Sequence, residues 1–303
     1  MMKSIFPIIC LFFFAQCSAQ NTTVSSEGLQ EILNLSYLSK EEIVVDSLQQ
    51  LNLVLPQNTD KPPLFIWVGG GAWSFVNRHQ EMNLARQFAH EGVAVASVGH
   101  RLSSGAFSPN AHDVGVQHPA HVEDLAAAFH WLKQHADEYG YDADRIFVGG
   151  FSSGAHLAAL LASDGRYLGK YGYPTTAITA ILPIAGAYDI ADYYSVFKDN
   201  DDPAVQEMAR THVMDVFGPV EGFEAASPAT YIDQLEVPML LVSEGGLYNY
   251  TKVYEEMLWE SDYRSCQIFH VFDKDHAGLW RDISTNENSL TRQVMLSFIR
   301  QHG

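Results

Sequence analysis

Short apolar runs alternate with helical segments along most of the chain, and this alternation constrains the fold more than any other feature. The run 51–55 places leucine at every second position, and the run 64–68 is apolar throughout. Segment 119–139 instead repeats its apolar residues at helical spacing, and segment 155–162 is apolar nearly all round, as in a buried helix. Further strands are expected at 93–98, 146–148, 178–184, 238–242 and 267–272, and further helices at 252–260 and 289–300. This alternation predicts an α/β fold, with a mostly parallel sheet covered by helices on both faces.

The rhythm continues to the end of the 303-residue chain without internal repeats, so we expect one domain over residues 20–303. Residues 190–235 interrupt this alternation with tyrosines, an acidic stretch and turn residues, and we interpret them as a small lid insertion over a site.

The chain is strongly acidic: Lys and Arg number 18 against 36 Asp and Glu, for a formal net charge of −18. Such an acidic chain is not expected to bind nucleic acid.

Residues 1–19 have the pattern of a secretory signal peptide. Lys3 precedes an apolar run over 5–14, and small residues follow it up to Ala19. The run is too short to span a bilayer, and no second apolar run of spanning length follows. We therefore expect cleavage after Ala19 and a secreted or periplasmic protein. Lipid attachment at Cys17 is the alternative, which Gln16 makes less favourable.

The strongest chemical motif is Gly150-Phe151-Ser152-Ser153-Gly154, between an expected strand and the buried helix. A nucleophilic serine on a tight strand-to-helix turn needs small neighbours, which the two glycines provide. The helix N-terminus favours the negative charge that develops during acyl transfer. Ser152 is therefore the candidate nucleophile.

A second motif, Gly69-Gly70-Gly71-Ala72-Trp73, directly follows the strand 64–68. Small residues there let the backbone approach a ligand closely. We expect the N–H groups of Gly71, Ala72 and Ser153 to form an oxyanion hole. The motif is not a phosphate-binding loop, because no Lys-Ser or Lys-Thr pair follows it.

A serine nucleophile needs a base, and His276 is the histidine that follows the last expected strand. The acid that orients it is less clear from the sequence. Glu244 is the one carboxylate at the end of the strand 238–242 and is the first choice. Asp189, after the preceding strand, and Asp273 are the alternatives, together with another arrangement or a Ser-His dyad that has no acid.

These motifs resemble the α/β-hydrolase superfamily, in its hormone-sensitive-lipase-like and feruloyl/acetylxylan esterase-like group. The resemblance runs from about Leu51 to the C-terminus. The segments that carry it are Gly69 to Trp73, His100-Arg101-Leu102, His118 to Asp124, Phe151 to Leu157 and Ala226-Ser227-Pro228. It implies small acyl chains as substrates, on plant or algal polysaccharides among others.

The chain departs from the group's pattern at two places. The group's oxyanion-loop histidine, which normally braces that loop, is replaced by Gly69. Its usual acid, an aspartate two or three residues past Glu244, is replaced by Gly246 or Leu247. A glutamate reaches further than an aspartate, so an acid shifted to Glu244 is one interpretation. A weakened or inactive enzyme is the other.

We therefore expect a secreted serine esterase that forms an acyl-enzyme on Ser152 and needs neither metal nor organic cofactor. Its partner would be a small-molecule or glycan ester. An aryl-formamide hydrolase is an alternative, since such enzymes resemble this group. A non-catalytic binding protein on a hydrolase scaffold is another, suggested by the two departures.

Overall fold

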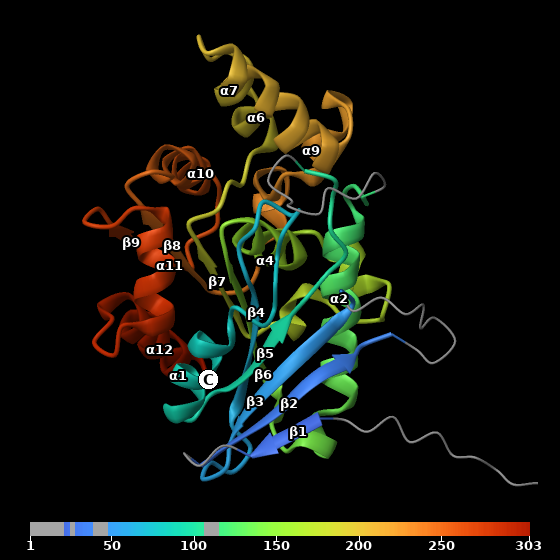
Figure 1. Ribbon diagram of the computed structural model, residues 1–303, viewed down its shortest axis with the longest axis vertical. Helices are drawn as coiled ribbons and strands as arrows, with labels where there is room; N and C mark the ends of the chain where they lie inside the picture. Colours follow the sequence, from blue (N-terminus) through green and yellow to red (C-terminus); the bar gives the residue numbers. More distant parts are fainter. Residues whose placement is uncertain (1–20, 25–27, 39–47, 106–114) are drawn as a thin grey trace, which may run out of the picture.

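The computed structural model describes residues 21–24, 28–38, 48–105 and 115–303. The expected signal peptide at 1–19, with its cleavage site and Cys17, lies outside the described residues and stays a prediction. Figure 1 shows a twisted central sheet with helices packed on both sides and a group of helices above it.

The sheet has nine strands in the described part of the chain, in the order β1-β2-β3-β5-β4-β6-β7-β8-β9. The first three are antiparallel to their neighbours, and the strands from β5 to β9 pair in parallel. The strands are β1 (Asn21–Val24), β2 (Leu29–Ser36), β3 (Gln50–Pro56), β4 (Pro63–Val68), β5 (Ala94–Val98), β6 (Asp142–Phe151), β7 (Ala180–Ile184), β8 (Met239–Glu244) and β9 (Cys266–Val271). The predicted, mostly parallel α/β architecture is confirmed.

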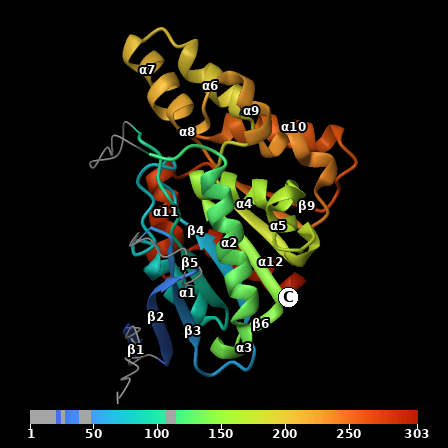
Figure 2. The ribbon, with the colours of Figure 1, turned by 90° about the vertical axis from the view of Figure 1, so that its right-hand side faces the viewer.

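Alternate side chains of each central strand point to opposite faces, and each face builds its own core. In β4, Leu64 and Ile66 belong to one core, whereas Phe65 and Trp67 belong to the other. The first core is covered by α2 (Ala120–Gln134), α4 (Ser153–Ser163) and α10 (Tyr248–Glu260). The second is covered by α1 (Met82–His90), α11 (His276–Thr285) and α12 (Leu290–His302), which Figure 2 shows behind the sheet. Two short helices, α3 (Ala136–Tyr139) and α5 (Gly165–Gly169), complete the first side.

Several elements differ from expectation. The predicted helix 119–139 is divided into α2 and α3 at His135. Strand β6 extends well beyond the expected 146–148 on both sides. Strands β1 and β2 and helices α1 and α11 were not predicted. These differences arise because edge strands and the ends of helices and strands have weaker apolar patterns than the buried central strands.

The segment expected as a lid insertion is helical. It contains α6 (Ile190–Lys198), α7 (Pro203–Met208), a π-helical stretch η2 (Ala209–Met214), α8 (Asp215–Phe217), η3 (Val220–Gly222), α9 (Phe223–Ala226) and η4 (Pro228–Gln234), and η1 (Thr175–Ala177) lies earlier in the chain. Figure 1 shows α6, α7 and α9 above the carboxyl ends of the parallel strands. Among the described residues, none of these or the other helices has both the length and the apolar character needed to cross a membrane.

Candidate active site

The strand order reverses at β4, which has β5 on one side and β6 on the other. In parallel α/β sheets such a reversal opens a crevice beyond the carboxyl ends of the strands. The glycine-rich loop follows β4 and Ser152 follows β6, so the topology brings both predicted motifs to this crevice.

Ser152 occupies the sharp turn between β6 and α4, with φ 56° and ψ −117°. Non-glycine residues rarely adopt a positive φ, and such strain is concentrated at functional sites. The flanking glycines are required by space: a Cβ on Gly150 would overlap Gly154, and one on Gly154 would overlap the carbonyl of Val68. The turn can therefore form only with glycine at both positions.

The loop after β4 lies directly against this turn. A Cβ on Gly70 would stand 3.1 Å from Ser152 Cβ and 2.8 Å from the ring of Phe151. Gly71, Ala72 and Trp73 have φ of 150°, 46° and 57°. Within the described residues, the backbone N–H groups of Gly71 and Ala72 donate to no protein acceptor. Two N–H donors beside the candidate nucleophile are thus available to a ligand.

His276 is the first residue of α11, and its ring packs on Phe151 with ring centroids 4.5 Å apart. Its Nδ1 lies 3.2 Å from Oε1 of Glu244. When Nδ1 donates to this carboxylate, Nε2 is left as the free acceptor. Burial lowers the pKa of His276, and the neighbouring Glu244 opposes this shift.

Glu244 is fully buried at the end of β8. Its carboxyl group accepts hydrogen bonds from the backbone N–H groups of Gly246 and Leu247, the second at 2.9 Å. A Cβ on Gly246 would stand 3.1 Å from Glu244 Oε2. The longer side chain therefore turns back over the loop, close to the positions where the resembling group carries its aspartate.

The two alternative acids are engaged elsewhere. Asp189 caps α6 by accepting from the N–H groups of Ala191 and Asp192. Asp273 pairs with Lys274 at 2.9 Å on the surface. Of the three carboxylates weighed from the sequence, the structure brings Glu244 alone to His276.

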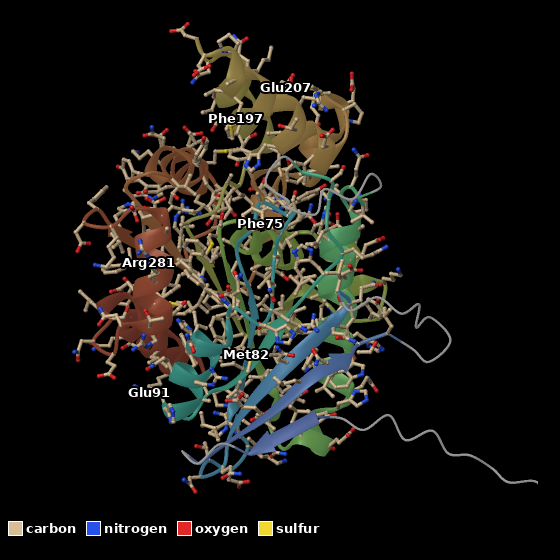
Figure 3. The ribbon with its side chains drawn as sticks, in the orientation of Figure 1. Phe75, Met82, Glu91, Phe197, Glu207 and Arg281 are labelled. Atoms are coloured by element: carbon tan, nitrogen blue, oxygen red, sulfur yellow. The ribbon has the colours of Figure 1, made fainter. Side chains whose placement is uncertain are left out.

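A cavity of about 430 Å³ connects these parts. Ser152, Ser153, His276, Gly71 and Ala72 all line it, so five of the six predicted site residues share one cavity, and Glu244 stands behind His276. The remaining lining residues are Gly70, Trp73, Phe75, Gln80, Glu81, Phe151, Ala187, Tyr193, His212, Leu247, Ala277 and Trp280. Figure 3 shows Phe75 between the upper helices, which carry Phe197 and Glu207, and the lower body of the protein.

The insertion contributes Tyr193 and His212 to the cavity wall. Tyr193 Oη and His212 Nε2 are 2.5 Å apart, and both rings pack around Trp73 of the glycine-rich loop. Burial lowers the pKa of His212 to about 4, so this histidine is neutral at physiological pH. The insertion thus forms one wall of the cavity and packs against the glycine-rich loop.

Sequence reasoning missed Glu81 and Trp280. Glu81 is only 3% exposed, and its carboxyl accepts from the indole N–H groups of Trp67 and Trp280. Burial raises the pKa of Glu81, and these two hydrogen bonds oppose the shift. Trp280 lies one helical turn after His276, and this spacing could have placed it beside the base in the sequence analysis. No local sequence pattern identifies Glu81.

Within the described residues, no group of three or more His, Cys, Asp or Glu side chains is placed to hold a metal ion.

The chain is similar to known proteins in sequence and in fold. A family model described as BD-FAE matches residues 51–245. Esterase LipQ of Mycobacterium tuberculosis is 30% identical over 189 residues, which cover 61% of this chain and 42% of LipQ. The chain therefore matches less than half the length of that relative.

Two solved structures are similar in fold. Esterase B from Lactobacillus rhamnosis superposes with a TM-score of 0.72 at 19% identity, over 91% of this chain and 86% of that one. A truncated carbohydrate esterase from gut microbiota superposes with a TM-score of 0.67 at 18% identity, over 92% and 98%. The expected α/β-hydrolase fold is confirmed.

Proposed function

The chain belongs to the BD-FAE family, and from this premise we propose that it is a serine-dependent carboxylic ester hydrolase. The observation that carries the proposal is one cavity that contains the strained Ser152, the N–H groups of Gly71 and Ala72, which have no acceptor among the described residues, and His276 backed by Glu244. The similarity to an esterase supports the same reaction class.

In the proposed reaction, His276 Nε2 takes the proton of Ser152 Oγ while Oγ attacks the ester carbonyl carbon. The carbonyl oxygen becomes an oxyanion, which accepts from the N–H groups of Gly71, Ala72 and Ser153. Glu244 stabilises the imidazolium that forms. The C–O bond then breaks, and His276 gives its proton to the departing alcohol. Water repeats the sequence on the acyl-enzyme, which releases the acid and restores Ser152.

Hydrolysis of p-nitrophenyl acetate by residues 20–303 tests the proposal. We expect Ser152→Ala to lower kcat by at least about 10³-fold. Ser297→Ala is the matched control, because it removes a serine hydroxyl from the exposed side of α12, away from the cavity. Labelling by a fluorophosphonate probe should follow the same pattern. A folded wild type that neither hydrolyses the ester nor reacts with the probe would favour a non-catalytic binding protein.

We further propose that the ester substrate of this reaction is a glycan ester. A second hollow of about 680 Å³ shares Gln80 and Trp280 with the ester cavity. Its wall also contains His79, Asn83 and Arg86, side chains that can bond to sugar hydroxyl groups beside an aromatic ring. The similar fold of a carbohydrate esterase agrees with this choice.

Acetylated xylo-oligosaccharides provide the test. Asn83→Ala should raise KM for the acetylated oligosaccharide several-fold and leave KM for p-nitrophenyl acetate unchanged, because the small ester does not reach the second hollow. Equal effects on both substrates would contradict the assignment. An aryl-formamide that is hydrolysed faster than either ester would favour that alternative activity.

We also propose that residues 1–19 direct export, on the sequence pattern alone. Expression of the full chain followed by mass spectrometry of its N-terminus should give Gln20 as the first residue. A lipid-modified Cys17 at the N-terminus would instead establish the anchored alternative.

A further inference from the structure

Glu81 is a buried carboxyl group on the wall of the cavity, and the mechanism above does not use it. Its Oε2 accepts from Trp67 Nε1 at 2.7 Å, and Trp280 Nε1 lies 3.1 Å from Oε1 and 3.3 Å from Oε2. A buried carboxyl group is costly unless its oxygens are hydrogen-bonded, and here two indole N–H groups meet that need.

The two indoles belong to the two halves of the proposed site. Trp67 lies in β4, two residues before the glycine-rich loop begins. Trp280 lies in α11, four residues after His276, so both side chains lie on one face of that helix. A single carboxyl group therefore connects the strand that presents the oxyanion donors with the helix that presents the base.

Gly69 shows how closely Glu81 approaches the loop. A Cβ on Gly69 would stand 2.7 Å from Glu81 Oε1 and 2.9 Å from its Cδ. The φ of Gly69 is not in the left-handed region, so the backbone does not require glycine there. Glycine is required for a steric reason, because the Glu81 carboxyl group occupies the space that a side chain at position 69 would need. This is the position where the resembling esterases carry the histidine that braces their loop.

We propose that Glu81 is a positioning residue for ester hydrolysis: through Trp67 and Trp280 it fixes the loop of Gly71 and Ala72 relative to His276. The inference rests on the proposed function. Its role is to hold the donors and the base in reacting geometry, and displacements of about 1 Å can cost about 10²-fold in rate. The loop brace lost with the histidine is thereby supplied from another part of the chain.

Two substitutions remove the connection with little change of shape. Glu81→Gln places an amide NH₂ where an indole N–H also donates, so one of the two hydrogen bonds is lost. Trp280→Phe removes the N–H and keeps an aromatic ring. We expect each to lower kcat for p-nitrophenyl acetate about 10- to 100-fold with KM changed less than about twofold. The double variant should be no slower than the slower single variant, because both break one connection.

The readout must separate positioning from mere folding. Rates are therefore expressed per site labelled by the fluorophosphonate probe, and the pH profile of kcat/KM is recorded. A looser α11 changes both the burial of His276, which lowers its pKa, and its contact with Glu244, which raises it, so the acid limb should shift from its wild-type position. Glu255→Gln is the matched control, since Glu255 is another mostly buried carboxylate that contacts His270 outside the cavity.

Wild-type kcat per labelled site together with an unchanged acid limb in Glu81→Gln would overturn the inference, even if that variant unfolds at a lower temperature. If Glu81→Gln does not fold, the same result in Trp280→Phe decides against it. Failure of the proposed function has a different signature, which is a wild type whose hydrolysis does not depend on Ser152. That result would overturn both proposals.

Discussion

His276 Nδ1 lies 3.2 Å from Glu244 Oε1, and the same carboxylate accepts from two backbone N–H groups of its own loop. The loop therefore fixes the orientation of the carboxylate, and the carboxylate fixes the tautomer of the imidazole. Such an arrangement suits a residue that stabilises an imidazolium without taking its proton.

Replacing Glu244 with Gln tests this relationship. The amide cannot stabilise an imidazolium as a carboxylate does and can favour the wrong tautomer, so kcat for p-nitrophenyl acetate should fall by about 10²- to 10⁴-fold with KM little changed. Asp189→Asn is the control, because Asp189 caps α6, and it should keep at least half of the activity. Normal turnover in Glu244→Gln would remove Glu244 from the mechanism.

The pH profile of the wild type carries a second prediction. The base must be neutral to accept the proton of Ser152, and burial lowers the pKa of His276 from its usual 6.5. The acid limb of kcat/KM should therefore have its midpoint below pH 6.5. In Glu244→Gln the midpoint should move lower still, since the carboxylate raises the pKa of His276. A midpoint above 6.5 in the wild type would be inconsistent with this environment.

The turn at Ser152 predicts a contrast between two glycines in helices. A Cβ on Gly154 would overlap the carbonyl of Val68, so Gly154→Ala should abolish labelling by the fluorophosphonate probe and lower the melting temperature. Gly169 has open space around its Cβ position, and Gly169→Ala should stabilise the protein by up to about 1 kcal/mol. Equal behaviour of the two variants in labelling and thermal unfolding would argue against the close approach of α4 and β4.

Gly69 and Glu81 should be coupled in stability. Gly69→Ala in the wild type forces a methyl group against the Glu81 carboxyl and should cost about 1–3 kcal/mol in the free energy of unfolding. In the Glu81→Ala background the clashing atoms are absent, and the same substitution should cost close to nothing. Urea unfolding of the four proteins measures the difference as a double-mutant cycle. Equal costs in both backgrounds would show that the two positions do not share this space.

Buried neutral histidines predict that acid destabilises the fold. Burial lowers the pKa of His118 to about 4, of His156 to about 3 and of His212 to about 4. In the unfolded chain these groups titrate near 6.5, so between pH 6.5 and about 4 only the unfolded state takes up protons. The free energy of unfolding should therefore fall with pH in this window, by up to about 1.4 kcal/mol per pH unit for each histidine.

Urea unfolding at pH 7, 6 and 5 checks this dependence. His118→Gln should make the slope shallower, because one of the three groups no longer titrates in the unfolded state. An identical slope in the variant would contradict a His118 that stays neutral in the folded protein.

Local sequence patterns predicted the central strands, the candidate nucleophile Ser152 and the candidate base His276. The glycines around Ser152 are required by a turn of five consecutive residues, and His276 is identified by its place after the last strand. Each of these two features can therefore be found in the sequence alone. Glu81 is not, because its role depends on three elements that meet only in the folded protein. Strand β2 was missed for a related reason: it pairs at the antiparallel side of the sheet, where partial exposure weakens the apolar pattern.

The two departures from the group's pattern have the same physical form. Next to Gly69 lies the carboxyl of Glu81, and next to Gly246 lies the carboxyl of Glu244. In each case the glycine leaves space that a carboxyl group occupies: Glu81 comes from another part of the chain, and Glu244 lies two residues earlier in the same loop. At both positions the space beside the glycine is therefore occupied by a carboxyl group and not empty. At position 69 the consequence is mutual exclusion: in this fold a side chain larger than glycine and the Glu81 carboxyl group cannot occupy the same space.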